Sequence, residues 1–208
     1  MENFIVTFAR GFGTGGKEIA SMLAKDLGIH CYENRILTLA SQMSGLDEKL
    51  FLDINERIRN NGGFTGFLKG LPRSRQYIAR NEKFVSDDRL FEYQSQIIRN
   101  LADQESCVIV GRCVNYVFKD RPNTLRVFVH APWEFRVEKS REKISGSDEE
   151  IEKFLRRDDK RKQDYYRKFA GGDWSDATNY DLCLNAGKLG FEKCVDAILA
   201  QMNVMGIK

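Results

Sequence analysis

The sequence lacks the features that mark secreted, zinc-binding and membrane-spanning chains. Its five cysteines include no Cys-x-x-Cys pair, so we expect reduced thiols rather than disulfides or a zinc site. No apolar run approaches the roughly 18 residues that a membrane helix needs. Residues 1–4 show no basic segment followed by an apolar one, so no signal peptide is expected. These absences favour a cytoplasmic chain that has no membrane partner.

A strong excess of charge of one sign is also missing. Lysine and arginine number 33 and aspartate and glutamate 30, which leaves a net charge of +3 at pH 7. So balanced a chain is not expected to bind nucleic acid or an acidic membrane surface. Proline is scarce, with three residues, and the 42% hydrophobic content excludes disorder. The 208 residues fit one α/β domain or a domain carrying insertions.

Short apolar segments alternate with helical patterns along the chain. Strands are predicted over 3–8, 29–32, 107–110, 125–130 and 180–184, and helices over 18–27, 35–43, 90–102 and 191–202. The apolar strands have the composition of strands buried on both faces. This alternation predicts an α/β fold with parallel strands and right-handed crossovers.

Two stretches are too long to be simple crossovers. Residues 35–104 include a glycine-rich segment at 62–70 that is predicted to be a connecting loop. Residues 136–170 are dense in charge, and Ser147 with Glu150 forms a Ser-x-x-Glu capping box that predicts a helix start. We expect both stretches to lie over one end of the sheet.

The sharpest motif is a glycine loop that follows the first predicted strand and precedes the first predicted helix. Gly11-Phe-Gly-Thr-Gly-Gly16-Lys17 matches G-x-x-x-x-G-K in the context that this motif requires. Glycines let successive N–H groups converge on phosphate oxygens, and the helix N-terminus adds positive potential. The candidate phosphate-binding residues are Gly11, Gly13, Thr14, Gly15, Gly16, Lys17 and Glu18. A glycine turn that binds nothing is the alternative.

Two further features concern cations. Arg112 follows a predicted strand that ends at Val110, a place where α/β proteins bind ligands. The basic residues of 156–168 alternate with acids, and on composition alone this segment is interpreted as a solvated helix face with i,i+4 ion pairs. Two histidines, His30 and His130, are a weak basis for a metal site.

Several of these motifs together resemble the bacterial cytidylate kinase-like family. They are the glycine loop, Val-Ile-Val-Gly-Arg-Cys at 108–113, Asp164-Tyr-Tyr-Arg, Gly172-Asp-Trp and Tyr180-Asp-Leu-Cys-Leu-Asn. The resemblance implies a three-layer P-loop fold of the nucleoside monophosphate kinase type, with a five-stranded parallel sheet. It implies a single kinase domain with a core of residues 1–34, 105–135 and 171–208. The stretches 35–104 and 136–170 would be the helical substrate-binding insertion and the lid.

The resemblance also implies roles for individual residues. Residues 11–17 would hold ATP, and Glu18, where Ser or Thr usually contacts Mg²⁺, is the candidate metal ligand. Arg112 matches the arginine that binds the monophosphate, and Arg89 and Arg35 are further candidates for the acceptor. Lys17 with Arg136, Arg157 and Arg161 would carry catalysis by neutralising charge, the last two near Asp159. The expected partner is a small-molecule nucleotide, and the chain is expected to be a monomer or homodimer.

Departures from the family pattern leave the acceptor open. True cytidylate kinases have Asp-Gly-Arg-Asp where this chain has Val110 and Cys113 around Gly-Arg, and residues 33–35 lack the usual Ser and Arg arrangement. The leading hypothesis is phosphoryl transfer from ATP to a nucleoside monophosphate such as CMP. The alternatives are a P-loop kinase for another small metabolite and a nucleotide-binding sensor without catalysis.

Overall fold

A computed structural model describes residues 3–33, 35–49, 51 and 86–207 of the chain. Five parallel strands form one sheet in the order β2-β3-β1-β4-β5. The strands are β1 (Ile5–Arg10), β2 (His30–Tyr32), β3 (Cys107–Val110), β4 (Thr124–His130) and β5 (Leu182–Asn185). The predicted parallel α/β fold is therefore confirmed. The predicted connecting loop at 62–70 lies outside the described residues.

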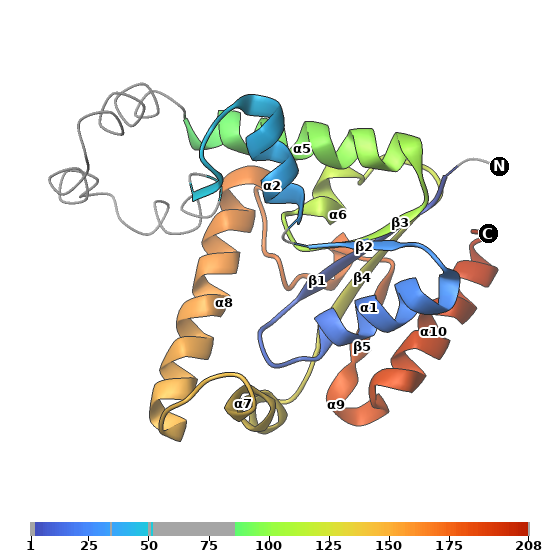
Figure 1. Cartoon of the computed structure of the whole chain (residues 1–208). Coiled ribbons are helices and arrows are strands. Elements are labelled where there is room, and N and C mark those ends of the chain that lie inside the picture. Colours follow the sequence, from blue (N-terminus) through green and yellow to red (C-terminus); the bar gives the residue numbers. More distant parts are fainter. Residues whose placement is uncertain (1–2, 34, 50, 52–85, 208) are drawn as a thin grey trace, which may run out of the picture.

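Helices cover both faces of this sheet (Figure 1). The described helices are α1 (Gly16–Leu27), α2 (Arg35–Ser44), α5 (Asp87–Gln104), α6 (Val114–Val117), α7 (Trp133–Arg141), α8 (Asp148–Ala170), α9 (Ala186–Leu189) and α10 (Phe191–Val204). α1 and α10 lie on one face, and α2, α5 and α6 lie on the other. Among the helices of the described part, none is both long and apolar enough to span a bilayer.

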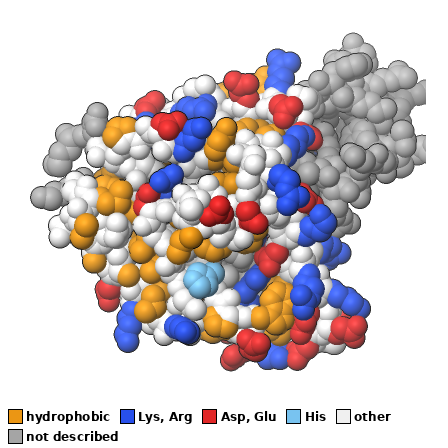
Figure 2. All heavy atoms as spheres, turned by 180° about the vertical axis from the view of Figure 1, so that it is seen from behind, with side chains coloured by type: hydrophobic (Ala, Val, Ile, Leu, Met, Phe, Trp, Pro, Cys, Tyr) orange, Lys and Arg blue, Asp and Glu red, His pale blue; other side chains and the backbone are white. Residues whose placement is uncertain are grey.

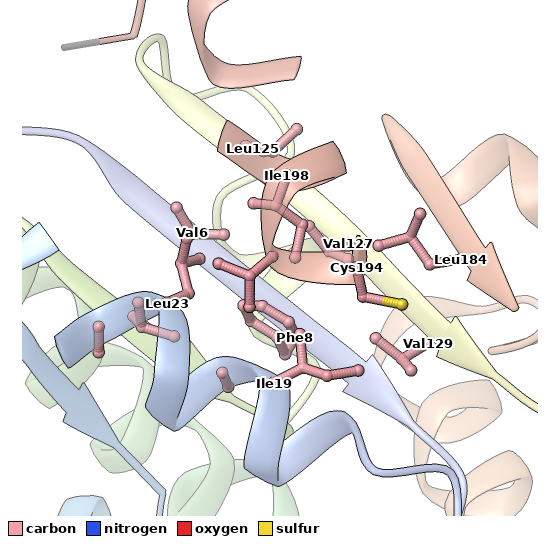
Figure 3. Close-up of a cluster of buried hydrophobic side chains, with 14 of the residues drawn as sticks. Val6, Phe8, Ile19, Leu23, Leu125, Val127, Val129, Leu184, Cys194 and Ile198 are labelled. Atoms are coloured by element: carbon pink, nitrogen blue, oxygen red, sulfur yellow. The ribbon is translucent and has the colours of Figure 1, made fainter. Parts of the chain in front are cut away.

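The alternation of side chains along β1 builds two cores. Val6 and Phe8 pack on the face of α1 and α10, with Ile198 and Cys194 of α10 against them (Figure 3). Ile5 points the other way and joins the cluster formed with α2, α5 and α6. Successive strand residues face opposite sides, so an interior strand must be apolar on both, as the sequence predicted.

Four of the five strands differ from the prediction by one or two residues at one end or at both, and β1 and β5 differ most. β1 begins at Ile5 rather than residue 3 and continues to Arg10, because Ala9 and Arg10 pair with β4. β5 begins at Leu182 rather than residue 180. The carboxylate of Asp181 instead accepts hydrogen bonds from the backbone N–H of Arg126 at 2.9 Å and from its guanidinium at 2.6 and 3.0 Å.

The helix boundaries follow local signals in the sequence. α1 ends at Gly28, which has a left-handed backbone, and the capping box of Ser147 and Glu150 starts α8. α8 then runs along the carboxyl edge of the sheet, from the neighbourhood of α7 to that of α2 (Figure 1). Residues at the ends of β1 and β3 line one cavity together with residues of α8.

Truncation of the α10 core should destabilise the whole domain. Ile198 is fully buried between the sheet and α10, so Ile198→Ala leaves a cavity and should lower the free energy of unfolding by about 2–5 kcal/mol. Val204 on the same helix is 79% exposed, so Val204→Ala is the matched control and should leave stability unchanged. Urea unfolding measures both; equal stabilities would contradict this packing.

Candidate active site at the carboxyl edge of the sheet

The glycine loop between β1 and α1 has the geometry of an anion cradle. Gly13 and Gly15 have left-handed backbone with φ of 75° and 79°, and no described residue accepts the N–H groups of Gly13 or Gly15. The Thr14 hydroxyl donates to the carbonyl of Gly11 at 3.0 Å and accepts from the N–H of Gly16 at 3.4 Å, which fixes the turn. Unpaired N–H groups at a helix N-terminus are suited to phosphate oxygens.

At two positions of the loop, neighbouring residues leave no room for a side chain. A Cβ on Gly13 would lie 2.5 Å from the backbone oxygen of Arg136 in α7, and one on Gly15 would overlap the Phe191 ring. The start of α7 and the start of α10 therefore both contact the loop backbone directly. Any side chain at either glycine would push these helices away.

Arg136 ties the glycine loop to α7 and α8. Its Nε donates to the carbonyl of Phe12 at 2.9 Å, and its two terminal nitrogens donate to both oxygens of Asp159, each at 2.8 Å. The Arg136 side chain is 12% exposed. This bidentate pair holds a cation against the loop, so the predicted Arg136 does lie beside the phosphate-binding candidates.

Lys17 is paired with a carboxylate that the sequence analysis did not assign. Glu33, which directly follows β2, lies 2.7 Å from Lys17 Nζ and 2.9 Å from a guanidinium nitrogen of Arg10. The hydrogen bond that Lys17 donates to the Glu33 carboxylate raises the pKa of Lys17. Burial raises the pKa of Glu33, but Lys17 and Arg10 outweigh it and the net pKa is lowered. Glu33 thus neutralises the positive charge of Lys17, which the sequence analysis assigned to a phosphate group.

Glu18, the candidate metal ligand, forms an ion pair with Lys143, which follows α7. Burial raises its pKa, but the Lys143 hydrogen bond overcomes this and the pKa lies below its usual range. Within the described ranges there is no cluster of three or more His, Cys, Asp or Glu side chains that could hold a metal ion. Mg²⁺ takes one or two carboxylates together with substrate phosphates and water, so Glu18 fits that requirement once it exchanges Lys143 for the ion.

Arg112 lies at the end of β3 and lines a small buried cavity. The cavity has a volume of about 70 Å³, and Arg10, Lys162 and Tyr165 also line it. Within the described part of the chain Arg112 has neither a hydrogen-bond nor an ion-pair partner. Burial lowers its pKa, and the like charges of Arg10 and Arg161 add to this. Arg112 also has a φ of 62°. Its left-handed backbone costs free energy, and so does a desolvated charge without a partner.

The charged segment 156–168 is only in part the solvated face that its composition indicated. Exposed residues do form i,i+4 pairs, such as Lys160 with Asp164 at 2.7 Å. Asp158, however, is 5% exposed and faces inward, where it binds Lys162 and, at 2.5 Å, Arg161. Burial opposes ionisation of Asp158, but these two cations hold its pKa below the usual range. The prediction of a fully solvated face is therefore corrected for Asp158 and Lys162.

Three other predicted arginines lie apart from this cavity. Arg157 is exposed on α8, and Arg35 is exposed at the start of α2, where its charge acts on Tyr32 and Glu105. Arg89 lies over the ring of Tyr93 on its own helix, 5.9 Å from the ring centroid. None of the three lines the Arg112 cavity. Their assignment to substrate or catalysis stays a prediction.

A larger open cleft lies on the other side of Trp174. It has a volume of about 480 Å³ and is lined by Thr14, Arg136 and Asp159 together with the aromatic rings of Phe128, His130 and Trp174. The glycine loop borders this cleft through Thr14, whereas the Arg112 cavity is reached from β1 only by Phe8, Ala9 and Arg10. On the surface seen in Figure 2, acidic and basic side chains are interspersed along the side where α8 lies, so that side carries no uniformly basic face.

Sequence reasoning missed Arg10, Glu33, Lys162 and Tyr165 as site residues. Arg10 is the last residue of β1, and Glu33 directly follows β2. The carboxyl end of a parallel strand is itself a position that indicates a ligand site. Lys162 and Tyr165 continue a stripe that Ile151, Leu155 and Asp158 begin, at spacings of three and four residues. Charged residues within such a buried stripe are the signal that was available.

Substitution of Gly13 should separate the cost of backbone strain from the cost of the contact with α7. Gly13→Ala must displace Arg136. It should therefore lower the free energy of unfolding and weaken the affinity for an ATP analogue more than tenfold. Gly28→Ala is the control, because Gly28 also has positive φ (66°) but has no atom within 4 Å of a built Cβ. It should lose only about 1 kcal/mol of stability and bind the analogue normally. Calorimetric titration and urea unfolding measure both; identical behaviour of the two variants would contradict the contact.

Comparisons with known proteins agree with this architecture. No curated protein matches the chain. An uncharacterized protein from Eubacterium ventriosum ATCC 27560 is 21% identical, with a TM-score of 0.70 over 97% of this chain and 99% of that one. A gluconokinase from Sinorhizobium meliloti 1021 (13%, TM-score 0.53, coverage 98% and 93%) and a shikimate kinase from Bacteroides thetaiotaomicron (14%, 0.51, 96% and 98%) share the fold.

These structural likenesses show the fold of P-loop kinases and no more. The model of the cytidylate kinase-like family, by contrast, matches residues 5–188. The match includes the glycine loop, all five strands and the whole of α8. The chain belongs to the cytidylate kinase-like family.

Proposed function

We propose that the protein is an ATP- and Mg²⁺-dependent kinase that transfers a phosphoryl group to the phosphate of a small acceptor, a nucleoside monophosphate such as CMP. The observation that carries this proposal is the partly buried guanidinium of Arg112, which has no counterion among the described residues and lies beside the Lys17–Glu33–Arg10 cluster. An unpaired buried charge is costly. An anionic acceptor would neutralise it.

The glycine loop is suited to the triphosphate of ATP. The free N–H groups of Gly13 and Gly15 would hold phosphate oxygens, and Lys17, whose side chain is 62% exposed, would exchange Glu33 for the β- and γ-phosphates. Glu18 would hold Mg²⁺, which supplies charge neutralisation on the phosphates when bound. Family membership supports the use of a nucleotide.

The transfer itself needs positioning and charge more than proton chemistry. An oxygen of the acceptor phosphate attacks the γ-phosphorus of ATP, the bond to the β–γ bridging oxygen breaks, and ADP leaves with that oxygen. Arg136, Arg161 and Arg157 would neutralise the charge of the transition state. The division into core, substrate-binding insertion and lid (136–170) belongs to this proposal, because closure of the lid would exclude water from the reaction.

Calorimetric titration tests the two proposed sites in order. A non-hydrolysable ATP analogue with Mg²⁺ should bind first, and CMP should then bind the loaded protein. Lys17→Ala should remove analogue binding, whereas Arg112→Ala should remove CMP binding and leave analogue binding intact; each should lower kcat by about 10²–10³-fold. Analogue binding without any CMP binding would exclude cytidylate, and binding without turnover on a panel of acceptors would indicate a sensor.

A second candidate function, transfer to an acceptor hydroxyl, is favoured by the position of Glu33. A hydroxyl acceptor must lose its proton during transfer. Once ATP has taken Lys17, the Glu33 oxygen that bound Lys17 could accept that proton, while Arg10 keeps the other oxygen. A phosphate acceptor needs no such base. The substitution Glu33→Gln therefore distinguishes the two acceptor classes.

For a phosphate acceptor, Glu33→Gln should bind the ATP analogue a few-fold more tightly, because a carboxylate that competes for Lys17 is gone, and should keep kcat within severalfold. For a hydroxyl acceptor, kcat should fall by about 10²–10⁴-fold. Glu105→Gln is the control, since Glu105 precedes β3 at the opposite end and pairs with His30 and Tyr32. Steady-state kinetics on both acceptor classes measures the outcome.

A further inference from the structure

The small cavity beside Arg112 contains a second polar group that lacks a partner. The hydroxyl of Tyr165 is buried and makes no hydrogen bond in the described part of the chain, although the residue lines the cavity. Its ring is held by Phe91 and Phe169. The neighbouring Tyr166, in contrast, accepts a hydrogen bond from Asn115 at 3.0 Å. A buried hydroxyl without a partner costs free energy, so a hydrogen-bond acceptor placed in the cavity would stabilise this arrangement.

The unpartnered groups at the cavity are both donors. Burial raises the pKa of Tyr165, so its hydroxyl keeps its proton, and Arg112 can only donate. Lys162 lines the same cavity and is held there by Asp158. Burial lowers the pKa of Lys162 even though Asp158 acts in the opposite direction, and the charge of Arg10 adds to the lowering. An anion with several acceptor oxygens would satisfy all of these groups at once.

Charge and volume define the anion. Arg10, Arg112, Arg161, Lys162 and Lys17 bring five positive charges to this region, against the two carboxylates of Glu33 and Asp158. A net excess of three positive charges favours a dianion over a monoanion. The volume of about 70 Å³ is small and leaves room for a phosphate group.

We infer that Tyr165 and Lys162 complete, together with Arg112, a subsite for one phosphate group. The subsite deepens the proposed function, because it assigns this phosphate to the acceptor and leaves the remainder of the acceptor outside the cavity. Tyr165 donates one hydrogen bond to a phosphate oxygen, and Lys162 supplies a charge-assisted one. Both residues belong to α8, so an acceptor phosphate would bind α8 to the ends of β1 and β3.

Titration of inorganic phosphate into the full chain, saturated with the non-hydrolysable ATP analogue and Mg²⁺, tests the subsite while the glycine loop is occupied. Tyr165→Phe removes only the hydroxyl and should weaken phosphate binding about tenfold or more, the size expected for a hydrogen bond to a charged group. Lys162→Gln should weaken it to a similar extent. Tyr116→Phe is the matched control, because Tyr116 lies on α6 away from this cavity.

Further measurements make the outcome decisive. Because the Tyr165 hydroxyl has no partner among the described residues, Tyr165→Phe should unfold in urea at the wild-type concentration and bind the ATP analogue normally. Phosphate binding that is unchanged in both Tyr165→Phe and Lys162→Gln would overturn the inference, as would acetate binding as tightly as phosphate. If the analogue fails to bind but phosphate binding to a Lys17→Ala chain still depends on Tyr165, the subsite stands and the kinase proposal fails.

Discussion

Repulsion between like charges is the constraint on which the carboxyl edge of this sheet depends. At an effective dielectric constant of 20, two unit charges 4 Å apart interact by about 4 kcal/mol, so a group of cations cannot be gathered without compensation. Glu33 compensates Lys17 and Arg10, Asp159 compensates Arg136, and Asp158 compensates Lys162 and Arg161. The carboxylates thus hold the cations in position at this edge.

Helix α8 supplies most of this compensation because of how its sequence is patterned. Its buried stripe passes from Ile151 and Leu155 through Asp158 and Lys162 to Tyr165. The apolar ends attach the helix at two places, to α7 by Ile151 and Leu155 and to the α5 cluster by Tyr165. The charged middle of the stripe therefore faces the sheet edge, where aliphatic side chains would have closed the site.

Much of the fold could be predicted from the sequence, because the signals are local. The apolar strands, the capping box at Ser147 and the glycine loop each depend on residues adjacent in the chain, and they were found within a few residues of their observed bounds. The glycine loop and Arg112 were found because motif and strand end coincide. The five strands were predicted from local patterns, whereas their order in the sheet depends on tertiary pairing and was not predicted.

The remaining parts of the site depend on contacts between distant segments. The pairing of Glu33 with Lys17, or of Arg136 with Phe12, 124 residues apart, leaves no trace in local spacing. Composition even misdirected the interpretation of 156–168, because it counts charges without regard to the face of the helix on which they lie. Asp158 and Lys162 became recognisable as site residues only when the whole buried stripe of α8 was considered.

The ring of Phe191 beneath Gly15 has a consequence for how the chain folds. The glycine loop lies between β1 and α1, whereas Phe191 begins α10, the last of the described helices. Because the backbone of Gly15 rests on that ring, the loop is supported from below only after α10 docks on α1 and the sheet. The conformation of the loop is therefore a property of the whole folded domain, and a change that loosens α10 would loosen the loop with it.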